Sequence, residues 1–315
     1  MRRIVLVVGP TAAGKTALAL RLAEAANAEI VSADSQQVYV GMDIGTSKAT
    51  ADERARVPHH LLDVVRPDEA MTAARWAALA DEAIADAAAR GRGSIVCGGT
   101  GLYVRALLYG LFDGPPADAS LRARLEAEAD AAPEGTASLH ARLLVVDPAA
   151  AARIDRRDRV RLIRALEVHE LTGEPISAHQ ERHDYKNAPL RYDVRGVGLG
   201  PPRPALHARI DARVDQMIAA GLEAEVRALG AAGYDFGLRA FSAIGYREMC
   251  AFLQGKLDLA EAVRGIKSAT KRYARRQLSW FRAEPAVSWY EDPADVDVEG
   301  LSVWLRDVPP PNPNR

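Results

Sequence analysis

Cysteine is almost absent from this chain of 315 residues, and its two cysteines, Cys97 and Cys250, lie far apart in the sequence. Two separated cysteines exclude a disulfide-stabilised framework and do not supply a zinc ligand set. Hydrophobic residues make up 48% of the chain and charged residues 26%. This is the composition of an ordinary globular protein that can bury a hydrophobic core.

Long hydrophobic runs are absent as well. The first apolar run, residues 4–8, ends at Gly9 and Pro10, and it is shorter than the roughly 7–15 apolar residues of a signal peptide. No segment approaches the roughly 18–20 apolar residues that cross a membrane. The sequence therefore predicts a soluble cytoplasmic protein. Its proline-rich tail, residues 309–315, is expected to hold no regular structure.

An excess of charge of either sign is also missing. The chain has 41 Lys and Arg against 42 Asp and Glu, so any binding of nucleic acid must depend on a local patch. Residues 264–282 contain seven Lys and Arg and no acid. Helical spacing places five of these cations on one face: Arg264, Lys267, Lys271, Arg272 and Arg275. This face is either a surface that follows phosphates or an ordinary solvated helix face.

Strand and helix patterns alternate along the first third of the chain. Strands are expected at 3–9, 28–34, 60–65 and 94–99, and helices at 15–26, 71–91 and 100–111. Residues 113–190 show almost no strand pattern and read as short helices with polar breaks. A strand at 191–200, helices at 204–229, 243–254 and 258–282, and a strand at 286–291 follow. The pattern predicts an α/β fold with a P-loop NTPase-like parallel sheet flanked by helices. This core is formed by residues 1–112 and 191–315, and an all-helical insertion domain occupies 113–190.

The first strand leads into a phosphate-binding loop. Gly9, Gly14, Lys15 and Thr16 have the spacing G-x-x-x-x-G-K-T between a strand and a helix. In such a loop, glycines let backbone N–H groups turn toward phosphate oxygens, and the helix N-terminus adds positive partial charge. Lys15 reaches the outer phosphate, and Thr16 is a candidate Mg²⁺ ligand. The predicted phosphate-binding residues are Gly9, Pro10, Thr11, Ala12, Ala13, Gly14, Lys15 and Thr16.

The second acidic residue that an ATPase uses to organise Mg²⁺ is missing from its usual place. The strand at 94–99 ends in Gly-Gly and is followed by Thr100, which offers only a hydroxyl. The strand that does end in an acid is 28–34, at Asp34, and Ser35, Gln36 and Gln37 follow it. A carboxylate there can accept a proton, and glutamine side chains suit the edge of a base. The alternative is an Asp-Ser helix cap with solvated glutamines.

Several motifs, taken together and in order, resemble the tRNA dimethylallyltransferases, also called tRNA isopentenyltransferases. The matching stretches are GPTAAGKT, SADSQQVYVGMDIGTSK, PHHLLDV, GGTGLYVRALLYG, RVRLIRALEV, RIDARVDQMIAAGLEAEV, AIGYRE and TKRYARRQLSWFR. Many eukaryotic members carry a C-terminal zinc finger that this chain lacks, so the chain resembles the bacterial type.

The resemblance implies that the loop holds the pyrophosphate of dimethylallyl diphosphate, with Mg²⁺ as the cofactor. The adenine just 3′ of the anticodon attacks the allylic carbon through its exocyclic amine. Asp34 is then the candidate base, Thr100 contacts the target adenine, and Lys15 stabilises the leaving group. Arg213 is a candidate for holding the pyrophosphate, and Arg209, one helical turn away, is a rival.

The anticodon loop of tRNA is the implied macromolecular partner, because the target base must be extruded from its stack before it can react. The expected tRNA contacts are Asp34, Ser35, Gln36, Gln37, Thr100, Arg122, Asp158, Arg159, Val160, Arg161, Leu162, Lys271, Arg272 and Arg275. We expect a monomer that makes no membrane contact.

Two other kinds of protein share the phosphate loop. A small-molecule or nucleotide kinase would transfer the terminal phosphate of ATP and would not need tRNA. A regulatory NTP-binding protein would couple its nucleotide to the ordering of switch loops, and the sequence shows no convincing pair of such loops.

Overall fold

The computed structural model describes residues 1–185 and 187–307. The chain divides into two compact units: an α/β unit, Met1–Leu108 with Leu190–Arg315, and a helical unit, Tyr109–Pro189. The sequence places the limits of the insertion at 113 and 190. The proline-rich tail at 309–315 lies outside the described residues.

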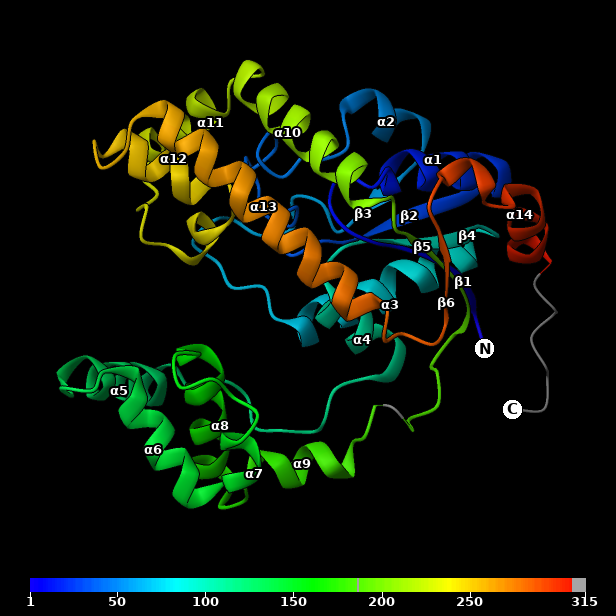
Figure 1. Cartoon of the computed structure of the whole chain (residues 1–315). Coiled ribbons are helices and arrows are strands. Elements are labelled where there is room, and N and C mark those ends of the chain that lie inside the picture. Colours follow the sequence, from blue (N-terminus) through cyan, green and yellow to red (C-terminus); the bar gives the residue numbers. More distant parts are fainter. Residues whose placement is uncertain (186, 308–315) are drawn as a thin grey trace. The chain divides into compact units, whose positions relative to one another are not determined.

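The α/β unit is built on one parallel sheet, which within the described residues has six strands in the order β3-β2-β4-β1-β5-β6 (Figure 1). The strands are β1 (Arg3–Val8), β2 (Ala28–Ala33), β3 (His59–His60), β4 (Gly93–Gly98), β5 (Asp193–Leu199) and β6 (Val287–Tyr290). Gly98 of β4 is in register with Val8 on one side and Ala33 on the other. The loops that follow β1, β2 and β4 therefore leave the sheet at the same edge.

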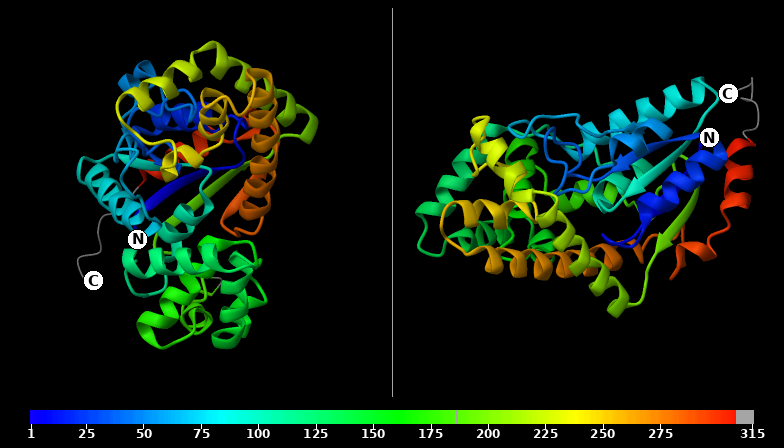
Figure 2. Two further views of the ribbon diagram at one scale, coloured as in Figure 1. Left: turned by 90° about the vertical axis from the view of Figure 1, so that its left-hand side faces the viewer. Right: turned by 90° about the horizontal axis from the view of Figure 1, so that it is seen from above.

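Helices cover both faces of this sheet, as is usual for a parallel sheet. The helix α1 (Lys15–Ala26) and the late helix α14 (Val298–Arg306) share a hydrophobic core with Val5, Val7 and Ile95, which point to one face. These two helices lie side by side although they come from opposite ends of the sequence (Figure 2). The opposite face is covered by α3 (Ala73–Ala89) and α4 (Gly101–Tyr109).

The remaining helices of the α/β unit lie beyond the carboxyl edge of the sheet (Figure 1). They are α10 (Arg203–Ala219), α11 (Leu222–Ala231), α12 (Tyr246–Leu253) and α13 (Leu259–Phe281), and a short α2 (Ala51–Arg56) lies earlier in the chain. Helix α13 begins at a capping box in which Asp258 accepts from Glu261 N. It packs along α10 through Ala274, Leu206 and Ile210. Helices α10 and α13 together form one wall beside the carboxyl edge of the sheet.

Most expected elements are confirmed, and two expectations are wrong. The helix expected at 204–229 is divided into α10 and α11, because Gly221 takes a left-handed backbone conformation with φ 98°. The strand expected at 60–65 contributes only His60 to the sheet. Positive φ values at Leu61 and Asp63 turn the chain away directly afterwards, and Val65 forms only an isolated bridge with Tyr39.

The helical unit has its own hydrophobic core and buries the charged side chain of Glu167. Its helices are α5 (Ala119–Ala131), α6 (Thr136–Val146), α7 (Pro148–Ala151), α8 (Arg159–Thr172) and α9 (Ile176–Arg182). The fully buried carboxylate of Glu167 accepts two hydrogen bonds from Arg122, at 2.7 and 2.8 Å, and one from Arg164 at 2.6 Å. Burial alone would raise the pKa of Glu167, but these bonds lower it below its ordinary value. The carboxylate therefore stays charged and ties α5 to α8.

Candidate functional site

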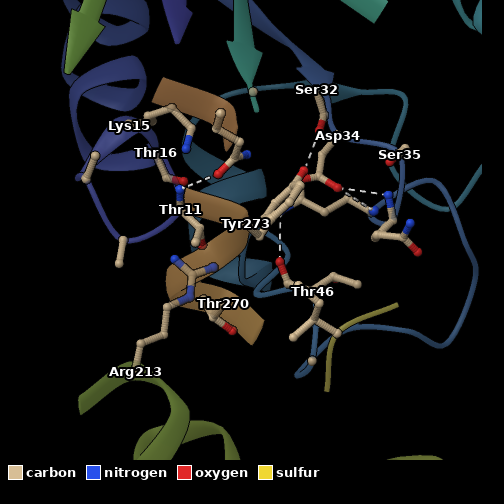
Figure 3. Close-up of a pocket in the computed structure, with 18 of the residues that line it drawn as sticks. Thr11, Lys15, Thr16, Ser32, Asp34, Ser35, Thr46, Arg213, Thr270 and Tyr273 are labelled. Carbon is tan, nitrogen blue, oxygen red and sulfur yellow. Dashed lines mark hydrogen bonds between the residues drawn. The ribbon is translucent and has the colours of Figure 1, made fainter. Parts of the chain in front are cut away.

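A cavity of about 640 Å³ opens at the carboxyl edge of the sheet. Its walls come from the phosphate loop, the segment 34–37 after β2, the loop at 45–46, and helices α10 and α13. Figure 3 shows Lys15, Asp34, Arg213 and Tyr273 around this space. The sheet register thus brings two sequence motifs, the phosphate loop and the Asp34 segment, to one cavity.

The phosphate loop has the geometry of an anion-binding site. Gly14 precedes the first turn of α1 with φ 96°, and the loop residues from Thr11 to Thr16 line the cavity. The amine of Lys15 folds back and donates to the carbonyl of Pro10 at 2.8 Å. Burial lowers the pKa of Lys15 to about 8, and the nearby charge of Arg213 acts in the same direction. A bound anion would therefore stabilise the protonated amine of Lys15, which burial and Arg213 otherwise destabilise.

Asp34 is held at the end of β2 by its own turn. Its Oδ1 accepts from Gln36 N at 2.8 Å and from Gln37 N at 3.3 Å. The local cap considered as an alternative from the sequence is thus present, and the same carboxylate also lines the cavity. Within residues 1–185 and 187–307, its second oxygen, Oδ2, takes part in no hydrogen bond or ion pair. One oxygen fixes the carboxylate, and the other remains for a ligand.

Thr100 supports this turn. Its hydroxyl accepts from Ser35 N at 2.9 Å, and its own N–H donates to Ala33 O at 3.0 Å. Thr100 is not one of the cavity-lining residues, whereas Asp34 and Ser35 are. Thr100 therefore helps to fix the backbone that carries Asp34, and its side chain is also hydrogen-bonded to Tyr273.

The two glutamines differ in what they can offer. The amide of Gln37 is used inside the protein, because its oxygen accepts from Ser32 Oγ at 2.9 Å and its nitrogen donates to Thr46 O at 3.1 Å. The side-chain oxygen of Gln36 is buried and has no hydrogen-bond partner in the described part of the chain. Gln36 is therefore the glutamine with a capacity left for a ligand.

Of the two arginines proposed from the sequence, Arg213 reaches the cavity. It lines the space and is half-buried, whereas Arg209 is exposed and does not line it. Figure 3 shows the Arg213 side chain extending from α10 toward Thr11. Burial lowers the pKa of Arg213, and the Asp34 carboxylate opposes this shift. The geometry favours Arg213 as the cation that faces the phosphate loop.

Helix α13 contributes two side chains to the cavity that the sequence did not assign to it, Gln277 and Tyr273. The buried amide of Gln277 accepts from Thr11 N at 2.9 Å and donates to Gly99 O at 3.0 Å, so it joins the phosphate loop to the loop after β4. A Cβ at Gly99 would lie 2.0 Å from the Gln277 nitrogen, so only glycine permits this approach. Burial, followed by the Asp34 charge, raises the pKa of Tyr273. Both residues lie within the basic segment 264–282. The many cations there indicate a phosphate-binding surface, and they do not mark a glutamine or a tyrosine as part of the cavity.

The predicted basic face of α13 is only partly exposed. Lys267 and Lys271 donate to Asp215 at 2.6 Å and to Asp211 at 2.7 Å on α10, and both lysines are half-buried. The other three cations, Arg264, Arg272 and Arg275, are exposed. The idea of one uniform cationic face is therefore corrected, since the two lysines hold α13 against α10.

The tRNA contacts predicted in the helical unit fall into two groups. Arg122 is bound to Glu167, and Leu162 is 0% exposed within the hydrophobic core. Around the start of α8, Asp158 caps the helix by accepting from Arg161 N at 3.2 Å, and Val160 is 68% exposed. Arg159 pairs with Asp130. Of the tRNA contacts predicted in the helical unit, those most exposed to a ligand therefore lie in the first turn of α8, among the residues that the structure describes.

Neither a metal cluster nor a membrane helix is found in the residues that the structure describes. In this part of the chain, no three His, Cys, Asp or Glu side chains are grouped so that they could hold a metal ion. No helix among these residues is both long and apolar enough to cross a membrane. Thr16, which lines the cavity, stays the candidate Mg²⁺ ligand.

Comparisons with known proteins agree on one family. The family model described as IPP transferase matches residues 37–284. A tRNA dimethylallyltransferase from Anaeromyxobacter dehalogenans (strain 2CP-C) is 57% identical over 307 residues, which cover 96% of this chain and 100% of the relative. One from Geobacter sulfurreducens is 50% identical over 295 residues, covering 94% of each chain.

Solved structures show the same likeness. The full-length tRNA isopentenylpyrophosphate transferase from Bacillus halodurans has a TM-score of 0.68 and 40% identity, covering 97% of this chain and 95% of that one. A eukaryotic dimethylallyltransferase, captured acting on tRNA, has a TM-score of 0.78 and 26% identity, covering 94% of this chain and 75% of that one. The P-loop-like α/β fold expected from the sequence is confirmed.

Proposed function

The chain belongs to the IPP transferase family, and on this premise we propose that it prenylates tRNA. The dimethylallyl group passes from dimethylallyl diphosphate to the exocyclic amine of the adenine 3′-adjacent to the anticodon, and pyrophosphate is released. The single observation that carries this proposal is the shared cavity, in which the phosphate loop and the Asp34 carboxylate face the same space.

The residues of the cavity supply what this substitution needs. The nitrogen of the adenine amine attacks the first carbon of the allyl group, and the carbon–oxygen bond breaks with its electron pair left on the diphosphate. Lys15, the loop N–H groups and Arg213 stabilise the negative charge that gathers there. Asp34 takes the proton that the amine loses, through the oxygen that its turn leaves uncommitted.

The cavity offers few protein ligands for a magnesium ion, and this agrees with the way Mg²⁺ is usually bound. Mg²⁺ commonly keeps several waters and is bound by substrate phosphates with only one or two protein ligands. The hydroxyl of Thr16, next to Lys15 at the start of α1, is the protein ligand that the loop offers. The bound ion would neutralise charge on the leaving diphosphate.

The tRNA side of the proposal rests on two surfaces, each within one unit. Arg272 and Arg275 are exposed on α13 and can contact phosphates of the anticodon stem-loop. In the helical unit, the residues before and in the first turn of α8 play the same role, through Arg159 and Arg161. Gln36, with an unpartnered side-chain oxygen, can accept from the amine of the extruded adenine.

The cellular setting follows from the substrate. An enzyme that modifies tRNA acts in the cytoplasm, where tRNA is found. In this proposal the protein acts as a monomer.

A kinase remains the runner-up, and the structure offers it little support. Kinases and ATPases of this fold organise Mg²⁺ with an acid near the end of a neighbouring strand. Here β4 ends at Gly98, and Gly99 and Thr100 follow. The Asp34 carboxylate occupies the end of β2 instead, within its own turn.

One incubation separates the two functions. The protein is mixed with labelled dimethylallyl diphosphate, Mg²⁺ and an unmodified tRNA transcript. A matched transcript with guanine at the target position serves as the control, because guanine lacks the adenine amine. We expect label in the adenine transcript alone. If no label enters tRNA, the protein is given ATP and a small acceptor in a parallel incubation, and consumption of ATP there would instead establish the kinase.

A further inference from the structure

A carboxylate outside the cavity holds the backbone of one cavity wall. Glu225 lies on α11 and faces the loop that follows the Asp34 segment. Its Oε2 accepts from Asp43 N at 2.9 Å and from Ile44 N at 2.7 Å, and its Oε1 accepts from Gly45 N at 3.2 Å. Three successive backbone donors thus converge on one side chain, as they do around a bound anion.

A tyrosine completes this arrangement. The hydroxyl of Tyr246, at the start of α12, donates to Glu225 Oε1 at 2.5 Å. Burial, followed by the charge of Glu225, raises the pKa of Tyr246, so the hydroxyl keeps its proton. A Cβ at Gly45 would lie 2.4 Å from the Tyr246 ring, so glycine is needed for the loop to approach the ring this closely. The clamp, defined as Glu225 and Tyr246 on residues 43–45, is therefore tightly packed.

The clamped loop is connected to the reacting groups by a short series of contacts. Gly45 and Thr46 line the cavity. The carbonyl of Thr46 accepts from the Gln37 side chain at 3.1 Å, and Gln37 N donates in turn to Asp34 Oδ1 at 3.3 Å. The position of the loop thus sets the position of Gln37, which helps hold the Asp34 carboxylate.

We propose that Glu225, together with Tyr246, is a positioning residue that fixes the loop whose residues Gly45 and Thr46 form the acceptor-side wall of the cavity, and thereby the orientation of Asp34. This inference rests on the proposed prenyl transfer and adds to it a residue that touches neither substrate. The clamp acts on the side of Gln37 and Asp34, whereas the phosphate loop is held separately by Gln277. Loss of the clamp should therefore affect the transfer step and leave diphosphate binding intact.

The proposal is tested with Glu225→Ala, Glu225→Gln and Tyr246→Phe. The matched control is Glu223→Gln on the same helix, because among the described residues Glu223 pairs only with exposed Arg227 at the surface. Prenyl transfer is measured at saturating dimethylallyl diphosphate, and pyrophosphate affinity is measured separately. Hydrogen exchange reports on the amides of residues 43–45.

We expect Glu225→Ala to lower kcat by about tenfold or more, since small displacements of reacting groups have large effects on rate. Its pyrophosphate Kd should stay within about twofold of wild type, because the phosphate loop is untouched. Glu225→Gln keeps one oxygen as an acceptor and should lose less, and Tyr246→Phe should show a smaller loss of the same kind. The hydrogen-exchange rates of the amides of residues 43–45 should be higher in Glu225→Gln than in the wild type, and highest in Glu225→Ala.

Three results would overturn the inference. They are a wild-type kcat in Glu225→Ala, a parallel loss of kcat and pyrophosphate binding, and equal effects of Glu225→Ala and Glu223→Gln. If wild-type protein transferred no prenyl group, the proposed function would fail. The exchange rates would still decide whether Glu225 orders the loop.

Discussion

Affinity for a prenyl diphosphate should fall steeply as the pH rises through 8, because Lys15 then loses its charge. Burial lowers the pKa of Lys15 from 10.5 to about 8 in the free protein. A bound diphosphate places negative charge beside the amine and restores a higher pKa, so binding takes up a proton. Affinity is therefore retained below pH 8 and lost as the free amine deprotonates above it.

The size of the effect follows from the two protonation equilibria. If the bound pKa returns to its ordinary 10.5, binding at pH 9.5 should be about twentyfold weaker than at pH 7.5, or about 1.8 kcal/mol. The last proton of a phosphate group is lost near pH 6, so the charge of the ligand is constant over this range.

Titration calorimetry with an unreactive thio analogue of dimethylallyl diphosphate measures both quantities, at fixed Mg²⁺ and ionic strength. Two buffers of different ionisation enthalpy give the number of protons taken up. We expect about 0.2 proton at pH 7.5 and about 0.9 at pH 9.5. Proton uptake and loss of affinity must agree, because both come from the same group.

Lys15→Met and Lys15→Arg are the controls. Methionine has no charge to lose, and the guanidinium of arginine stays protonated over this range, so both variants should bind with little pH dependence. A flat wild-type profile between pH 7.5 and 9.5 would refute the reasoning about Lys15. The same slope in Lys15→Met would show that another group titrates.

Three further outcomes are expected. Asp34→Asn keeps the acceptor for the turn but removes the base, so turnover should fall by about 10²–10⁴-fold with tRNA affinity in filter binding near wild type; parallel losses would point to a structural role. Arg272→Ala with Arg275→Ala should reduce the slope of log Kd against log salt by about 2, and an unchanged slope would remove α13 from the tRNA interface. Glu167→Gln should destabilise the helical unit by about 3 kcal/mol in urea unfolding at pH 7. Because the pKa of Glu167 is lowered from 4.5, this stabilisation should be complete above that pH and lost below it, and a variant as stable as wild type would contradict this account.

The sequence was most informative where local chemistry fixes structure. The G-x-x-x-x-G-K-T spacing predicted a loop between β1 and α1, and the structure confirms it. Asp34 was placed at a strand end because β2 is an apolar run that stops there. The register of β1, β2 and β4 then brings these segments together, as a parallel sheet requires.

The sequence was least informative where a contact joins distant segments. Gln277 lies 266 residues from Thr11, whose backbone it holds, and nothing in a basic amphipathic helix marks one glutamine for that role. Glu225 is comparable, since a glutamate on an ordinary helix gives no sign that three amides of a remote loop converge on it. The pairing of Lys271 with Asp211 was hidden for the same reason, because helical spacing identifies a face but not its neighbour.

The chain leaves the α/β unit for the helical unit after Leu108 and returns at Leu190. Beside this junction, Arg191 N donates to Leu108 O at 2.8 Å, and the Arg191 guanidinium donates to Leu107 O at 3.0 Å. These two bonds hold the two ends of the helical unit's connection to the α/β unit close together. For the sheet, the helical unit therefore replaces what could be a short loop between α4 and β5. Changes of length or charge within the helical unit can therefore leave the register of the strands undisturbed.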